Sequence, residues 1–452
     1  MACNVPAPRD NRCAWLPECY KREIPVTNRP ANDISRSIYT ERMPRHVAVR
    51  FARQSIRVYA RRILIVLIVS FVGAAVAPAQ SLPAQSLRAE AAPRCLPTFP
   101  FQDGWWGADA AYSIPLSDGR SVWIFGDTLY GDHRVVTGND PRMVRNTIGI
   151  SRCSQPGNWQ IQYVIRRGDD GQPHDFFQAE VLHPHASKTW YWALDGFVHE
   201  KDLWVTLLCV RNARVKRPDG FDFETCGTDL ARVSDLDTDP QKWKVAYFPL
   251  VPDGAAAYPS ATAVVDGDYA YLFALYEKDG RPMLLTRIPV AGLDAPRANL
   301  QFLSKDEKAA GKWAPGFKPK NALPVMPRGI SEMTVRYHPD LQKWLAVMRS
   351  PDFSSDAILL RTAPAITGPW SAGEVIYHIP EMQKNSAAHD SSEYDKNVFC
   401  YAGKEHPEFE QSGSLLITYV CNTTKVPDLA TKLKIYVPKV VEVPLPADVS
   451  AK

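Results

Sequence analysis

The stretch Gly107–Thr128, GADAAYSIPLSDGRSVWIFGDT, decides how this chain folds. Two short runs of strand-forming residues, 111–116 and 121–125, flank the sequence Ser-Asp-Gly-Arg at 117–120. Asp-Gly between two such runs predicts a β-hairpin, because glycine readily adopts the positive φ that a tight turn requires. Asp109 enters the first strand and Asp127 leaves the second. The hairpin therefore brings two carboxylates to one end of a sheet, where a catalytic or ligand-binding pair could form.

Similar groups of short strand-like runs recur about every 50 to 70 residues between Cys95 and Pro446. Turn residues separate the runs, and no helical periodicity extends beyond about two turns. The first predicted strands of five such groups are 111–116, 190–198, 258–265, 331–337 and 398–403. Repeated four-stranded groups of this form predict an all-β fold, a five-bladed β-propeller. A β-sandwich is the alternative, because the number of strands alone does not separate the two folds.

The residues in front of the repeats indicate export. The apolar run 63–77 follows three arginines and precedes Ala77-Pro78-Ala79, a small-x-small pattern typical of signal-peptide cleavage. The run is shorter than the ~20 residues of a membrane span, so cleavage is favoured over an uncleaved anchor. We expect membrane association only through such an uncleaved segment. We expect a secreted, periplasmic or cell-envelope protein. Its predicted parts are an N-terminal extension and signal peptide (1–79), a linker (80–94), the propeller (95–446) and a tail (447–452).

Six cysteines follow the apolar run, and in an exported chain an even number predicts disulfides. Six cysteines allow 15 connectivities. Because no CxxC or close Cys/His spacing occurs, a cysteine metal centre is disfavoured. We expect no cofactor and no metal site, and leave a structural ion at the centre of the propeller open. The most local pairing joins Cys95 to Cys153, Cys209 to Cys226 and Cys400 to Cys421.

The positive net charge of the chain comes from its leader. Residues 1–79 hold 13 of the 53 basic and 5 of the 49 acidic residues, which leaves 40 basic and 44 acidic residues, a net charge of −4, in the remainder. No basic patch with interleaved aromatic residues occurs there, so a nucleic-acid partner is disfavoured. The G-x-S-x-G, phosphate-loop and HExxH motifs are also missing, which argues against serine hydrolases, nucleotide-binding proteins and zinc proteases.

Several short motifs together resemble a known family. The set is similar to the secreted bacterial "domain of unknown function 4185" family, over most of the chain after the leader. That resemblance implies the fold of the five-bladed β-propeller glycosidases, which include arabinanases and levansucrases, and an endo-D-arabinanase activity. The motifs are Asp109-Ala110-Ala111-Tyr112-Ser113, Phe125-Gly126-Asp127-Thr128, Ser331-Glu332-Met333, Gly368-Pro369-Trp370 and His406-Pro407-Glu408.

Acidic residues on the first strands of the predicted blades are the candidate catalytic groups. Glycoside hydrolysis needs one carboxylic acid and one carboxylate that acts as base or nucleophile. The resemblance implies Asp109 from the first blade as base or nucleophile and Glu332 from a later blade as general acid. A neighbouring Asp195 or Asp127 would raise the pKa of the acid by like-charge proximity. Alternatively, Asp127 and Asp195 are turn residues that bind backbone amides, and Glu332 faces outward on an alternating strand.

Aromatic side chains near these acids favour a carbohydrate ligand. Trp105, Trp106 and Trp192 lie close in sequence to the first strands of two blades, where flat rings can stack on a sugar. Arg328 and His406 are further candidate ligands of the substrate. The alternatives are that Arg328 is simply exposed, the commoner case for arginine, and that His406 is a structural histidine. The sequence thus predicts an exported glycoside hydrolase that cleaves furanoside linkages of a D-arabinan polysaccharide or oligosaccharide. The alternative is a non-catalytic carbohydrate-binding or adhesion propeller at the cell envelope.

Overall fold

The computed structural model of the chain describes residues 95–131, 142–154, 157–184, 189–215, 222–308, 310–383, 396–425, 428–432 and 434–450. All of them belong to one unit of the chain, Ser86–Lys452. The predicted N-terminal extension, signal peptide and linker lie outside the described residues. Within those residues, no helix has both the length and the apolar character needed to cross a membrane.

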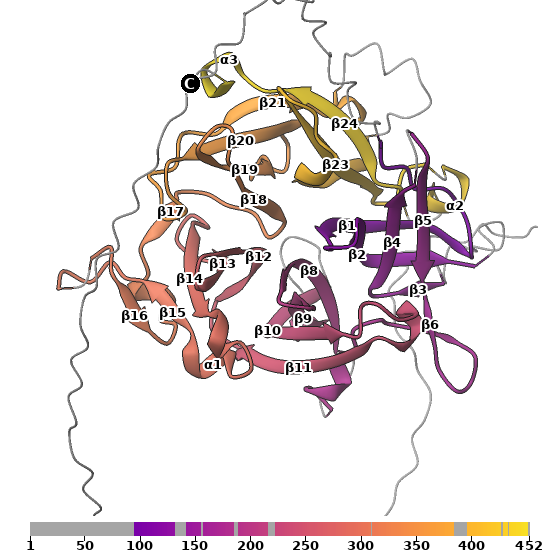
Figure 1. Cartoon of the computed structure of the whole chain (residues 1–452), viewed down its shortest axis with the longest axis horizontal. Coiled ribbons are helices and arrows are strands. Elements are labelled where there is room, and N and C mark those ends of the chain that lie inside the picture. Colours follow the sequence, from indigo (N-terminus) through magenta and orange to yellow (C-terminus); the bar gives the residue numbers. More distant parts are fainter. Residues whose placement is uncertain are drawn as a thin grey trace, which may run out of the picture. The chain divides into compact units, whose positions relative to one another are not determined.

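The first two blades are antiparallel sheets whose strands follow one another in chain order (Figure 1). The first blade consists of β1 (Trp105–Pro115), β2 (Arg120–Tyr130), β4 (Thr147–Cys153) and β5 (Trp159–Val164), with β3 (Met143–Val144) paired to β2. A ribbon of β6 (Arg166–Arg167) and β7 (Pro173–His174) separates it from the second blade. The second blade consists of β8 (Thr189–His199), β9 (Asp202–Asn212), β10 (Phe223–Ser234) and β11 (Lys244–Val251).

The remaining three blades repeat this arrangement. The third consists of β12 (Ala257–Asp266), β13 (Tyr269–Tyr276), β14 (Met283–Pro289), β15 (Gln301–Leu303) and β16 (Trp313–Pro315), with β17 (Pro324–Met326) paired to β14. The fourth consists of β18 (Met333–His338), β19 (Lys343–Arg349), β20 (Ala357–Ala363) and β21 (Glu374–His378). The fifth consists of β22 (Val398–Glu405), β23 (Ser414–Thr423) and β24 (Lys439–Pro444). Single helical turns form α1 (Pro296–Asn299), α2 (Asp428–Thr431) and α3 (Ala447–Ser450).

The first strands of the five blades form a closed ring, which can be followed in Figure 1. β1 contacts β8 and β22, β12 contacts β8 and β18, and β18 contacts β22. Sheets arranged radially around such a ring are the blades of a β-propeller. The predicted five-bladed propeller is confirmed, and the sandwich alternative is wrong.

Side chains fill the middle of the ring. Tyr112 on β1 donates a 2.9 Å hydrogen bond to the carbonyl oxygen of Ala261 on β12, which belongs to a blade that is not its neighbour in the ring. The Lys404 ammonium lies 4.4 Å from the centre of the Tyr112 ring. Both side chains are almost inaccessible to solvent. The two ends of the ring are therefore separate environments.

The opening hairpin forms around the predicted Asp118-Gly119 turn, where Gly119 has φ 81°. Its strands are longer than predicted, because β1 continues through an irregularity that the sequence pattern does not mark. Pairing with β2 shifts register twice between Ala108 and Tyr112, and the small residues Ala110 and Ala111 adopt φ 61° and 56°. β8, β12 and β22 also shift register within the strand. Such bulges redirect side chains and occur often beside active sites.

Three disulfides hold the sheets, and they have the predicted pairing. Cys95–Cys153 attaches the start of the described domain to β4. The other two bridges cross neighbouring strands, β9 to β10 and β22 to β23. Cys209–Cys226 and Cys400–Cys421 each bracket one strand connection, where sheet pairing already places the two backbones side by side. The six cysteines after the leader are accordingly structural.

Candidate active site

Asp109 lies at the β1 bulge and is half-buried. The hydroxyl of Tyr401, from β22, donates a hydrogen bond of 2.7 Å to Asp109 Oδ2. Gly126, on β2, faces the other carboxylate oxygen so closely that any side chain at 126 would collide with Asp109 Oδ1. The glycine of the FGDT motif is thus explained by the space that the Asp109 carboxylate requires.

The surroundings of Asp109 favour its protonated form. Burial raises the pKa of this carboxyl to about 8, and the negative charges of Asp127 and Glu332 contribute to the increase. Hydrogen bonds from Tyr401 and Tyr436 act in the opposite direction. At neutral pH, Asp109 therefore carries a proton that it can donate.

Asp127 lies at the same end of the first blade, as the hairpin predicted. Trp192 Nε1 donates to Asp127 Oδ1 at 3.1 Å, and Arg145 Nη1 donates to Asp127 Oδ2 at 3.2 Å. Burial raises the pKa of Asp127, and the charge of Arg145 opposes this increase. Asp127 thereby joins the first two blades, and it supplies like-charge proximity to Asp109.

Glu332 comes immediately before β18 and forms an ion pair with a buried lysine. Lys404 Nζ, from β22, donates to Glu332 Oε1 at 3.2 Å and to the carbonyl oxygen of Ala402 at 3.1 Å. Burial lowers the pKa of Lys404, and the Glu332 carboxylate opposes this decrease. The fourth and fifth blades thus present a carboxylate and an ammonium close enough to Asp109 for their charges to interact.

Asp195 occupies a different environment, because both of its oxygens are held by protein donors. Arg336 binds it bidentately, with Nη2 at 2.8 Å from Oδ1 and Nη1 at 2.9 Å from Oδ2. The hydroxyl of Thr262 and the backbone N–H groups of Ala263 and Gly196 complete the set, at 2.6, 3.0 and 2.9 Å. Asp195 is fully buried. The arrangement ties the second, third and fourth blades together at the centre of the ring.

The three predicted tryptophans have different positions. Trp105 and Trp106 are buried in the core, and the Trp105 ring stacks on Tyr163 with centroids 4.1 Å apart. Neither ring face is open to a ligand in this arrangement. Trp192 is partly exposed and hydrogen-bonded to Asp127, so it is the tryptophan of this set that lies beside the candidate acids.

His406 and Arg328, the two predicted polar ligands, do not present free hydrogen-bond donors beside the candidate acids. His406 is fully buried, and its ring nitrogens are 2.6 Å from the Ser113 hydroxyl and 2.7 Å from the Thr418 hydroxyl. Arg328 is exposed, and its charge contributes to the lowered pKa of Asp352 in the loop after β19. The structure thus gives His406 a set of protein partners and places Arg328 beside an exposed loop.

The sequence reasoning missed the basic and phenolic side chains of the site. Tyr401 and Lys404 come from β22, Tyr436 from the segment before β24 and Arg145 from the segment before β4. One signal was available, since Lys404 directly follows the apolar and small run VFCYAG at 398–403. A charged residue within a buried strand indicates a buried partner of opposite charge.

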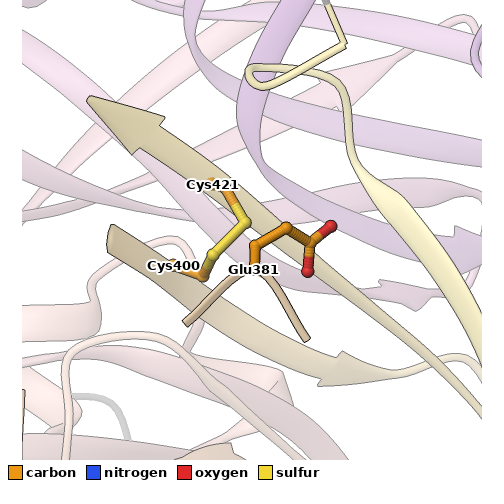
Figure 2. A group of neighbouring side chains, drawn as sticks. All are labelled: Glu381, Cys400 and Cys421. Atoms are coloured by element: carbon orange, nitrogen blue, oxygen red, sulfur yellow. A yellow bond between two sulfur atoms is a disulfide. The ribbon is translucent and has the colours of Figure 1, made fainter. Parts of the chain in front are cut away.

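Glu381, Cys400 and Cys421 also form a close group of metal-ligand residue types among the described residues. Figure 2 shows that the two sulfur atoms are bonded to each other beside the glutamate. A disulfide offers no thiolate, and Glu381 Oε2 accepts a 2.9 Å hydrogen bond from the Tyr419 hydroxyl. This group is therefore a structural bridge.

The raised pKa of Asp109 predicts that this residue makes stability depend on pH. The native carboxyl holds its proton up to about pH 8, whereas an unfolded aspartate loses it near about pH 4. The stabilisation is fully present below the unfolded pKa and is lost as pH rises through the native pKa. In thermal unfolding between pH 5 and 9, Asp109→Asn should exceed the wild type in Tm at pH 9, with a difference that shrinks toward pH 5. Parallel Tm curves would contradict this.

Comparison with known proteins places the chain in a family. Residues 99–443 match the family described as "Domain of unknown function (DUF5005)". The resemblance to the domain of unknown function 4185 was therefore wrong as to the family. No curated protein matches the sequence.

One solved structure shows the same fold, and others are more distantly similar. A protein of Bacteroides ovatus, named as a candidate hydrolase, is 17% identical with a TM-score of 0.58, over 75% of this chain and 86% of that one. The inulosucrase of Halalkalicoccus jeotgali is 12% identical with a TM-score of 0.44, over 79% and 91%. An exo-1,5-alpha-L-arabinanase from a bovine ruminal metagenomic library is 9% identical with a TM-score of 0.40, over 76% and 96%. At 17% identity, the similarity to the Bacteroides ovatus protein concerns the fold alone.

Proposed function

Because the chain belongs to the family described as a domain of unknown function (DUF5005), whose description names no reaction, we propose from the site itself that the protein is a glycoside hydrolase. The observation that carries this proposal is the pair formed by Asp109 and Glu332. Burial and neighbouring charges raise the pKa of the Asp109 carboxyl to about 8, and Glu332 is ion-paired with Lys404. Two neighbouring carboxyl groups in different protonation states are what glycosidic cleavage requires.

The electrostatics favour Asp109 as the proton donor and Glu332 as the carboxylate. The prediction from sequence gave these two residues the opposite roles, which the family resemblance implied from their blade positions and residue types. Asp109 would protonate the glycosidic oxygen as the bond from that oxygen to the anomeric carbon breaks. Glu332 would either attack the anomeric carbon or remove a proton from the attacking water, and the anomeric configuration of the product distinguishes these two routes.

The substrate that we propose is a furanoside polymer of D-arabinan type. Trp192 offers a partly exposed aromatic ring beside Asp127, and Tyr401 offers a partly exposed phenol ring beside Asp109. Flat rings of this kind can pack against the apolar face of a sugar while their polar atoms hydrogen-bond. We further propose that the protein acts outside the cytoplasm, as a secreted, periplasmic or cell-envelope protein. The three disulfides support this location.

The experiment is incubation of the purified chain with arabinan-containing cell-wall polysaccharide, followed by separation of the products. We expect the wild type to release oligosaccharides and Glu332→Gln to release less by a factor of roughly 10³. Asp340→Asn, an exposed carboxylate in the turn after β18, is the matched control and should keep full activity. Binding of the polysaccharide without release by the wild type would instead favour the adhesion function.

A further inference from the structure

A second acidic cluster lies toward the end of β18 that is far from Glu332. His338 is the last residue of β18, whereas Glu332 precedes the first residue of that strand. Glu405, the last residue of β22, directly follows Lys404, and its side chain contacts His338. Glu410 follows the short 3-10 helix η8 (Pro407–Phe409). These three residues form the His338–Glu405–Glu410 cluster.

The three side chains point their polar atoms at one another. One nitrogen of His338 and one oxygen from each glutamate all lie within 4.8 Å of one another. His338 Nε2 and Glu405 Oε1 are 2.5 Å apart, and their side chains are 14% and 0% exposed. An imidazole and two carboxylates thus converge in a nearly closed space.

The cluster contains a buried oxygen that the protein leaves without a donor. Glu405 Oε2 is inaccessible to solvent and has no hydrogen-bond partner among the residues that the structure describes. Glu410 uses its Oε1 to accept from the backbone N–H of Leu416 at 3.2 Å, and its charge interacts with that of Glu405. A buried carboxylate oxygen beside a second carboxylate calls for a cation or a shared proton.

Arg336, whose charge interacts with that of Glu405, does not supply that cation. Its guanidinium is bound bidentately to Asp195. Glu408 is a further carboxyl group nearby and also has a buried oxygen, Oε1, without a partner among the described residues. Three carboxyl groups are thus gathered around one imidazole.

An ion could reach the cluster from one side. Glu410 lines a cavity of about 680 Å³ that is also bounded by Gly119 in the opening hairpin and by the Cys95–Cys153 disulfide. The cavity thus lies at the turn end of the first blade, away from Asp109. It provides the entry path that a metal site needs.

We propose that the His338–Glu405–Glu410 cluster binds one Zn²⁺ ion, with a water from the cavity as fourth ligand. A nitrogen and two carboxylate oxygens suit Zn²⁺, whereas Ca²⁺ prefers an all-oxygen shell. Tetrahedral ligands about 2.0 to 2.2 Å from zinc lie roughly 3.4 Å apart. The direct contact between His338 and Glu405 must therefore open by about 1 Å, which the partly exposed imidazole permits. The ion would clamp the fourth blade to the fifth.

The test measures metal content and thermal stability of the full chain. After treatment with EDTA and equilibrium dialysis against ZnCl₂, MnCl₂ or CaCl₂, we expect one zinc per chain and weaker binding of the other two. Zinc at 100 times its Kd should raise Tm by about 5 °C. Glu410→Gln should weaken zinc binding at least about tenfold, because it removes one of three protein ligands while keeping the side chain's size.

Glu381→Gln is the matched control, because this glutamate belongs to the group that holds a disulfide in place of thiolates (Figure 2). It should bind zinc as the wild type does. His338→Gln gives a second test that leaves both glutamates in place, and it should weaken binding to a similar extent. Unchanged zinc affinity in both cluster variants would overturn the proposal. So would a wild type that takes up no zinc, together with a metal-free Glu410→Gln whose Tm is higher than that of the metal-free wild type, which would indicate a shared proton.

Discussion

Asp109→Asn should lower the release of oligosaccharides from a natural glycan by roughly 10³-fold, within the range expected for the loss of a general acid. The amide cannot give a proton to the leaving oxygen. It retains a carbonyl oxygen that can accept the hydrogen bond from Tyr401, and it fits the space that Gly126 leaves. The loss should appear in kcat while the fold is kept, which circular dichroism and the Tm would show.

The leaving group of the substrate distinguishes the two catalytic roles. An aryl glycoside whose phenol leaves without protonation needs no general acid, so Asp109→Asn should retain much more of its activity on that substrate than on the natural glycan. Glu332→Gln should lose activity on both, because it removes the base or nucleophile. An equal loss on both substrates in Asp109→Asn, with retention in Glu332→Gln, would restore the opposite assignment.

The opening hairpin provides the control for this experiment. Asp118 lies in the tight turn, where its side chain is 46% exposed and hydrogen-bonded to Arg120. Asp118→Asn makes the same chemical change in the same hairpin, at the end opposite to Asp109. It should leave the activity on both substrates unchanged, so a loss in Asp109→Asn alone would locate the chemistry at the bulge.

Arg336→Met should destabilise the protein by about 3–5 kcal/mol, the range found when one partner of a buried ion pair is removed. Arg336 donates two hydrogen bonds to Asp195, whose side chain is fully buried. Without the guanidinium, the aspartate would remain ionised at the meeting point of three blades or would take up a proton. Urea unfolding at neutral pH measures the loss directly.

Two further variants test the reason for this loss. Removing both charges in Asp195→Leu with Arg336→Met should give a protein more stable than Arg336→Met alone, because no uncompensated charge is left. Lys244→Met removes a surface ion pair to Asp235 in which the lysine side chain is 77% exposed, and it should leave the urea midpoint unchanged. A loss in Arg336→Met as small as that in Lys244→Met would contradict a structural role for the pair.

The repeat pattern predicted the fold that the structure has. Apolar alternation and Asp-Gly or charged turns are local signals, and they located the first strands of the second to fifth blades to within about two residues. They failed where the chain departs from regular pairing. The bulge at Ala110 and Ala111 depends on contacts with β2 and the neighbouring blades, so β1 began six residues earlier than the pattern indicated.

The candidate acids could be named from sequence, but their environments could not. Asp109, Asp127, Asp195 and Glu332 are all acids near the starts of predicted inner strands or at the end of a hairpin strand. Burial and neighbouring charges gave them different states: a protonated Asp109, an Asp127 held by Trp192 and Arg145, and an Asp195 locked to Arg336. These partners come from other blades, at sequence separations that no local pattern reports.

By itself, the sequence determined the strand order, the turn positions and the set of carboxylates near the strand starts, because each of these depends on neighbours along the chain. The tertiary structure alone decided which carboxylate holds a proton and which is paired. Closing the ring places Tyr401 and Lys404 from the fifth blade against the first and fourth. The pKa of a buried group depends on the charges and solvent around it in space. For Asp109 in the opening hairpin, only closure of the ring sets these surroundings.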